Sequence, residues 1–162
     1  MFPKIKVARF DKLAPGELFV LFESGKPCFA IKTEALEETS ESEMVLLGPT
    51  FPEGITEATV TKWQAATVVS YGTDFTVFLP QTPSAWFKTG ETRTSVCLAI
   101  SGDDVFVCAN GANYPPMYLQ CFINLKTGAL IERNLSQISA FTKTWEIAVT
   151  NPNLPPISLL KY

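Results

Sequence analysis

The side chains in this sequence that could do chemistry are carboxylates and thiols, because the 162 residues include no histidine. Without an imidazole, the Ser-His and Cys-His nucleophile arrangements are excluded, and so is the commonest metal ligand. Most hydrolase mechanisms are excluded with them. What remains is carboxylate acid–base chemistry, thiol chemistry, or no catalysis at all.

Carboxylates occur in two groups that could supply a general acid and a general base, as in a glycosidase. Asp103 and Asp104 are adjacent, and several glutamates fall within residues 37–43. Residues 101–104 read Ser-Gly-Asp-Asp, a sequence that reverses the chain, and acids in such turns are usually solvated. We therefore expect turn and surface roles for these acids and assign no catalytic residue.

The four cysteines, at positions 28, 97, 108 and 121, are separated by 69, 11 and 13 residues. No Cys-x-x-Cys pair is present to form a zinc knuckle, so we expect no metal site. The first ten residues lack the apolar stretch of a secretory signal, and the longest unbroken aliphatic and aromatic run, residues 18–22, is far too short to span a membrane. We expect a soluble cytoplasmic protein with buried, reduced thiols, no membrane association, and an unused sequon at Asn134.

Nucleotides and nucleic acids are not expected to be ligands. Residues 110–113 lack the lysine and the following helix of a phosphate-binding loop, so we expect no cofactor there. The 13 basic residues are scattered and the net charge is −3, which gives no electrostatic footprint for a phosphate backbone. Trp86, Phe87 and Lys88, with Arg93 nearby, could stack on bases. The simpler interpretation is an aromatic pair packed on the core beside a solvated lysine.

The elements that must position these residues are strands almost throughout. Residues alternate between apolar and polar, or run apolar for a few positions, between breaks rich in proline and glycine. The expected strands are residues 4–10, 18–22, 28–36, 44–47, 58–63, 66–71, 75–79, 95–100, 105–109, 118–125, 129–133 and 144–149. The sequence predicts a mainly β fold, a barrel or sandwich of antiparallel strands, with at most one or two short helices at residues 35–43 and 135–141.

The order of these elements suggests two similar halves. Residues 1–80 form an N-terminal β half, residues 81–93 a polar connector, and residues 94–162 a C-terminal β half that ends in an extended tail. The length is compatible with one ordinary domain or with two very small ones. We leave both organisations open.

A short repeat connects the halves. Residues 28–36, CFAIKTEAL, return as CFINLKTGAL at residues 121–130, with six identities when one inserted residue is allowed. A similar apolar strand precedes each copy, so duplication of a two-strand unit and coincidental hairpin chemistry both explain the match. Either way the repeat is scaffold: Phe29 and Phe122 are expected in the core, and residues 126–128 in a turn whose glycine takes the left-handed conformation.

One hairpin can be predicted residue by residue. If the chain turns at Gly102 and Asp103, counting outward places Cys97 opposite Cys108 on the neighbouring strand. Both faces of this hairpin are apolar, and strands of that kind are covered on both sides. Phe106 is therefore expected to be buried.

Low charge is the most unusual bulk feature of the chain. Charged residues make up 18% of it, against roughly a quarter in typical soluble domains, and the mean hydropathy is +0.15. Residues 153–162 place several apolar side chains in a segment whose prolines favour an extended conformation. We expect this tail to add an edge strand to its own sheet or to dock on a neighbouring chain.

The function that these features favour is a non-catalytic, β-rich interaction or structural module that binds itself or another protein. The alternative is a small-ligand site inside a β-barrel, or a simple enzyme that uses a carboxylate or a thiol. An enclosed apolar pocket with convergent polar groups would favour the alternative. A filled core and an exposed apolar surface would favour the interaction module.

Overall fold

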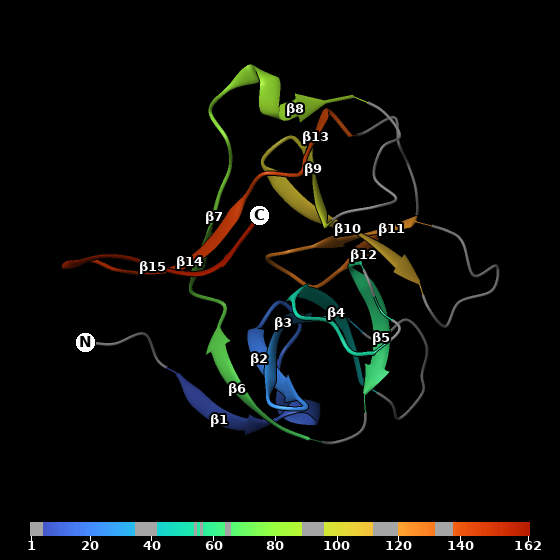
Figure 1. The fold of residues 1–162 in the computed structure, drawn as a ribbon, viewed down its shortest axis with the longest axis vertical. Coiled ribbons are helices and arrows are strands. Elements are labelled where there is room, and N and C mark those ends of the chain that lie inside the picture. Colours follow the sequence, from blue (N-terminus) through green and yellow to red (C-terminus); the bar gives the residue numbers. More distant parts are fainter. Residues whose placement is uncertain are drawn as a thin grey trace.

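Figure 1 shows the computed structural model of the chain, which describes residues 5–34, 42–53, 55, 57–63, 66–88, 96–111, 120–131 and 138–162. These residues are mostly in strands, and their helical elements are the single 3-10 turns η1 (Phe10–Lys12) and η2 (Pro83–Ala85). Within these ranges, no helix has the length and apolar character needed to cross a membrane. The chain is therefore mainly β, as its sequence predicts.

The described strands form two sheets. The large sheet has the order β1 (Lys6–Arg9), β6 (Thr67–Gly72), β2 (Leu18–Glu23), β3 (Lys26–Lys32), β4 (Ser42–Pro49), β5 (Thr59–Trp63), β10 (Asp104–Gly111), β9 (Cys97–Ser101), β13 (Ala140–Thr142) and β8 (Trp86–Phe87), and β11 (Gln120–Asn124) joins β10 to β12 (Leu130–Ile131). The small sheet has the order β15 (Leu154–Lys161), β14 (Glu146–Asn151) and β7 (Phe75–Phe78). The large sheet does not close into a barrel, so the architecture is sandwich-like.

The main core lies between strands that are far apart in the sequence. Its buried members include Leu18 and Val45 from the first half of the chain and Leu98, Ile147 and Leu160 from the second. The two halves also meet in the large sheet, where β5 and β10 pair in parallel, and in the small sheet, where β7 pairs with β14. The division of the chain at residues 81–93 stays a prediction.

Tight turns set the register of the hairpins. The turn between β2 and β3 has positive φ at both Ser24 (51°) and Gly25 (76°), the combination that matches the natural twist of two paired strands. Gly102 (φ 57°) begins the turn between β9 and β10, and Cys97 pairs with Cys108 across it. The predicted register of this hairpin is confirmed at all five of its pairs.

The predicted burial of this second hairpin is confirmed as well. Phe106 is buried and packs on one face with both cysteines of the hairpin and with Phe122 and Phe141. On the other face, Leu98 and Val107 belong to the main core. Both faces are therefore covered.

The helix predictions are wrong where the structure tests them. Glu43, placed in a helix by the sequence, lies in strand β4, and Ala140 and Phe141 begin strand β13. Phe141 pairs with Ala99 of β9 and with Phe87 of β8, so contacts from distant parts of the chain override its local preference. Residues 35–41 and 132–137 lie outside the described residues.

The two copies of the repeat touch each other. The Gly16 N–H donates a hydrogen bond to the Lys32 carbonyl at 2.8 Å, and the Glu34 N–H donates one to the Gly128 carbonyl at 3.0 Å. Gly128 has a φ of 71°, which confirms the predicted left-handed glycine. The turn that contains Gly16 therefore contacts both copies: it is hydrogen-bonded to Lys32 of the first copy and lies close to Gly128 of the second.

The inserted residue reverses the faces of the two cysteine-phenylalanine pairs. In the first copy Phe29 packs in the main core and Cys28 in a second cluster, whereas in the second copy Cys121 packs in the main core and Phe122 elsewhere. Side chains alternate along a strand, so one extra residue exchanges the two faces. Both phenylalanines are buried, as predicted.

Candidate functional site: a projecting hairpin

The acids that the sequence singles out do not come together as a catalytic pair. Asp103 is exposed in its turn, and Asp104 accepts a hydrogen bond from Asn124 Nδ2 at 3.2 Å. Glu43 is buried in β4, and residues 37–41 lie outside the described part of the chain. Within that part, no group of three metal-ligating side chains could hold an ion.

A buried carboxylate that the sequence did not single out is Glu17. It accepts hydrogen bonds from Ser70 Oγ at 2.7 Å, Lys6 Nζ at 3.2 Å and the Ala14 N–H at 3.2 Å. Burial acts to raise the pKa of Glu17, but the hydrogen bonds from Ser70, Lys6 and Ala14 outweigh it and the pKa is lowered. Glu17 is thus an anion at neutral pH that ties β1 and β6 to the start of β2, not a general acid.

The four cysteines are free and buried, which suits them to packing. Burial raises the pKa of Cys28 and of Cys121 to about 11 each. The hydrogen bond between the thiols of Cys97 and Cys108 lowers the pKa of Cys97 and raises that of Cys108, where burial adds to the effect. Cys97 Sγ also donates to the Thr142 carbonyl at 3.3 Å. Reactive cysteines need solvent access, and these four have little or none.

At β8, Phe87 packs on the core and Lys88 is exposed, as the simpler interpretation predicts. The Phe87 ring stacks on Phe141 with centroids 5.8 Å apart. The half-buried Trp86 donates a hydrogen bond from its indole to a backbone carbonyl at 3.1 Å. Arg93 lies outside the described residues.

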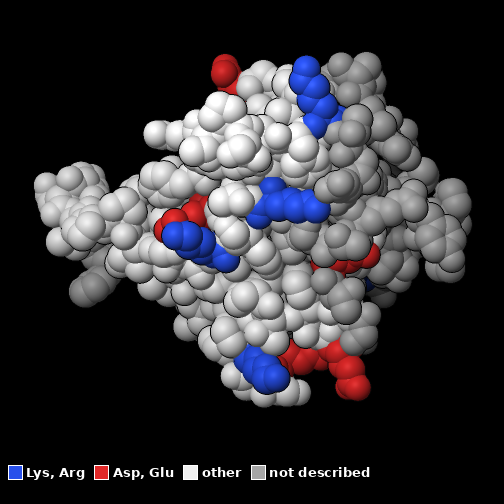
Figure 2. Space-filling view, turned by 45° about the horizontal axis from the view of Figure 1, so that its top comes forward, with Lys and Arg blue, Asp and Glu red and all other residues white. Residues whose placement is uncertain are grey.

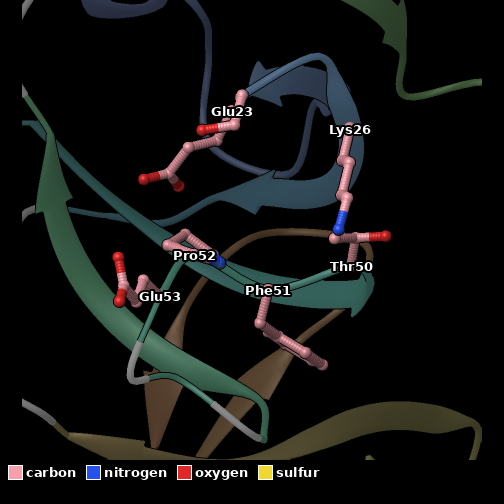
Figure 3. A pocket seen from close by; sticks show the side chains of 7 residues that line it. Glu23, Lys26, Thr50, Phe51, Pro52 and Glu53 are labelled. Carbon is pink, nitrogen blue, oxygen red and sulfur yellow. The ribbon is translucent and has the colours of Figure 1, made fainter.

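A pocket of about 250 Å³ lies beside the turn between β2 and β3. In Figure 3 the carboxylates of Glu23 and Glu53 lie on one side of Pro52, and the amine of Lys26 ends beside Thr50 on the other. Glu23 Oε2 is buried and has no hydrogen-bond partner within the described structure. The pocket is small for a ligand site, and only about half of its lining surface is apolar, whereas typical ligand pockets are predominantly apolar.

The most distinctive surface feature is the hairpin formed by β14 and β15, which extends from the body of the molecule in Figure 1. We call its outer part, residues 149–158, the arm. β15 is an edge strand, which confirms the expectation that the tail extends its own sheet. Pro155 and Pro156 lack an N–H group, so this edge is a poor template for a further strand.

The arm carries no charge and exposes two large apolar side chains. Leu154 is 52% exposed and Ile157 46%, and no Asp, Glu, Lys or Arg occurs from residue 147 to residue 160. Figure 2 shows it as a white extension at the left, without blue or red. A projecting element made only of uncharged residues is unusual on a soluble surface, where charge normally prevents association.

The arm faces the same way as the core side of the small sheet. Val149 pairs with Phe75 of β7 and with Ile157 of β15, so the three side chains share one face. Phe75 packs against the main core and Val149 is buried, whereas Ile157 continues the row into solvent. The core-facing side of the small sheet therefore continues into the arm, where the rest of the molecule no longer covers it.

Sequence reasoning found the tail but missed the arm. The signal was present, because the uncharged run from residue 147 to residue 160 spans β14 as well as β15. No protein-family model, curated protein or solved structure matches the chain. Function is therefore inferred from the geometry of the molecule alone.

Proposed function

We propose that the protein is a non-catalytic β-sandwich module that self-associates through its arm. The observation that supports this most is an uncharged arm on which Leu154 and Ile157 are about half exposed, with Ile157 on its core-facing side. Burying such side chains in an interface gains roughly 25 cal/mol for each Å² of apolar surface removed from water. An arm held away from the body gains this only by contact with another chain.

The alternative, an enzyme or ligand-binding protein, finds less support. The described acids and thiols are paired, buried or solvated as structural groups are. The pocket near Glu23 is smaller than typical small-molecule sites. The unpartnered oxygen of Glu23 could accept a hydrogen bond from water or from an ammonium group.

Substitution within the arm tests the proposal. We expect Leu154→Asp combined with Ile157→Asp to shift the protein from an associated species to a monomer, because the contact would then bury two unpaired charges. Light scattering at matched concentrations measures the shift. Removal of the whole tail is a poorer test, since it would also remove Leu160 and Tyr162, which pack in or against the main core.

The matched control is Ile131→Asp in β12. Ile131 is an exposed aliphatic residue like Ile157, and β12 lies on the opposite side of the molecule from the arm in Figure 1. The control should leave the molar mass unchanged. If both variants dissociated equally, or if the arm variant stayed associated, the arm would not be the contact.

A further inference from the structure

We infer that the arm of one copy lies on the outer part of strand β1 of a second copy, and that the second copy returns the same contact. This inference rests on the proposed self-association and goes further by naming the surface that receives the arm. The receiving surface is defined by Ile5 and Val7. Its geometry and its charge support the assignment.

The row of side chains that contains Val7 runs from the core to the edge of the large sheet. Val7 pairs with Val69 of β6, and Val69 pairs with Val20 of β2. Val20 is buried in the main core, Val69 is half-buried against it, and Val7 is 73% exposed. Ile5 shares the face of Val7, because side chains two apart on a strand point the same way. The core-facing side of the large sheet thus continues into solvent at β1.

The small sheet has the same property at the arm, where the buried Val149 is followed outward by the exposed Ile157. The sandwich is therefore open at this edge, with apolar side chains exposed on both of its sheets. Figure 1 places the N-terminal end of β1 and the tip of the arm on the same side of the molecule. The arm does not cover its own β1, since Val7 and Ile157 are both left exposed.

Charge favours a second copy over a strongly acidic or basic partner. Lys6 is paired with Glu17 at 3.1 Å and Arg9 with Asp11 at 2.9 Å, so the cations of β1 are neutralised within the chain. The arm has no charge to contribute. An acidic or basic partner would find no complementary charge on either surface, whereas two copies of this chain can meet there without like-charge repulsion.

The chain itself supplies both surfaces of such a pair, the arm and the outer part of β1. A reciprocal exchange uses each arm and each β1 surface once, so two contacts contribute to one twofold interface.

Site-specific cross-linking tests the exchange directly. One preparation carries Val7→Cys, a second carries Ile157→Cys, and each is treated with a short bismaleimide cross-linker alone and after mixing. The four native thiols are buried, so the introduced ones are the reactive groups. We expect a cross-linked dimer in the mixture and at most a trace in either preparation alone. Replacing the Val7→Cys partner by Ile131→Cys should abolish the product.

Other outcomes would overturn the inference. Cross-linking of Ile157→Cys alone would indicate contact between two arms, and cross-linking of Val7→Cys alone would indicate contact between two β1 strands. A chain that carries both substitutions and closes on itself as a monomer would show that the arm covers its own β1. If the mixture gave no product while sedimentation still showed a dimer, the receiving surface would be wrong and the proposed self-association would stand. If sedimentation showed only a monomer, both the receiving surface and the proposed self-association would be wrong.

Discussion

Replacing Phe106 with alanine is expected to lower the free energy of unfolding by about 3 to 5 kcal/mol. The side chain is 3% exposed and contacts a cluster of apolar residues on one face of the β9–β10 hairpin. Truncation removes the ring from this cluster and leaves a cavity that the surrounding strands fill only in part. Urea unfolding, followed by the fluorescence of the buried Trp145, measures the change.

Phe22→Ala is the control for this prediction. Phe22 is a phenylalanine of the large sheet that is 64% exposed, so its truncation should change the stability by less than about 0.5 kcal/mol. A loss below about 1 kcal/mol for Phe106→Ala would contradict the burial of Phe106, because truncating a buried phenylalanine lowers the free energy of unfolding by about 3 to 5 kcal/mol.

A second large effect is expected for Gly128→Ala. Gly128 has a φ of 71°, a conformation that costs an alanine about 1 to 2 kcal/mol. A Cβ atom there would also collide with the Lys32 carbonyl and lie 2.7 Å from the Gly16 nitrogen. Overpacking adds about 1 to 3 kcal/mol. The total expected loss is therefore about 2 to 5 kcal/mol, measured by the same urea unfolding.

Gly102→Ala separates the two parts of that loss. Gly102 also has a positive φ, 57°, but a Cβ atom there would meet no other atom within 4 Å. This variant should therefore lose only the 1 to 2 kcal/mol of the left-handed backbone. Equal losses for the two variants would mean that the two copies of the repeat are not in close contact at Gly128.

Local features of the fold could be predicted from the sequence, because the residues concerned are neighbours in the chain. The register that pairs Cys97 with Cys108 follows from a two-residue turn, and the left-handed Gly128 follows from its place after a strand. The sequence predicts that the tail either adds an edge strand to its own sheet or docks on a neighbouring chain, and β15 is an edge strand. These predictions needed only alternation and turn chemistry.

Non-local features could not be predicted in the same way. The parallel pairing of β5 with β10 and the pairing of β7 with β14 join residues that are 51 to 74 positions apart. The helix predicted at residues 135–141 is wrong at residues 140 and 141, because β13 gains its strand conformation from its pairing with β8 and β9. The open edge of the sandwich is of this kind too, since Val7 and Ile157 become exposed apolar residues at the same edge only after folding.

The site follows the same division between local and non-local information. The uncharged run from residue 147 to residue 160 can be seen in the sequence, and it identifies the segment that would make a contact. Its projection from the body depends on how the small sheet packs. The receiving surface at β1 depends on the pairing of Val7 with Val69 and of Val69 with Val20, which no local pattern contains.

Sedimentation equilibrium of the intact, unsubstituted chain tests the central claim most directly. The sample is studied over a concentration series that extends through the micromolar range, at moderate salt. The account predicts a mass that rises with concentration from 17.8 kDa toward twice that value, with little dependence on salt because the contact is uncharged. A mass that stays at 17.8 kDa across the whole series would contradict self-association through the arm.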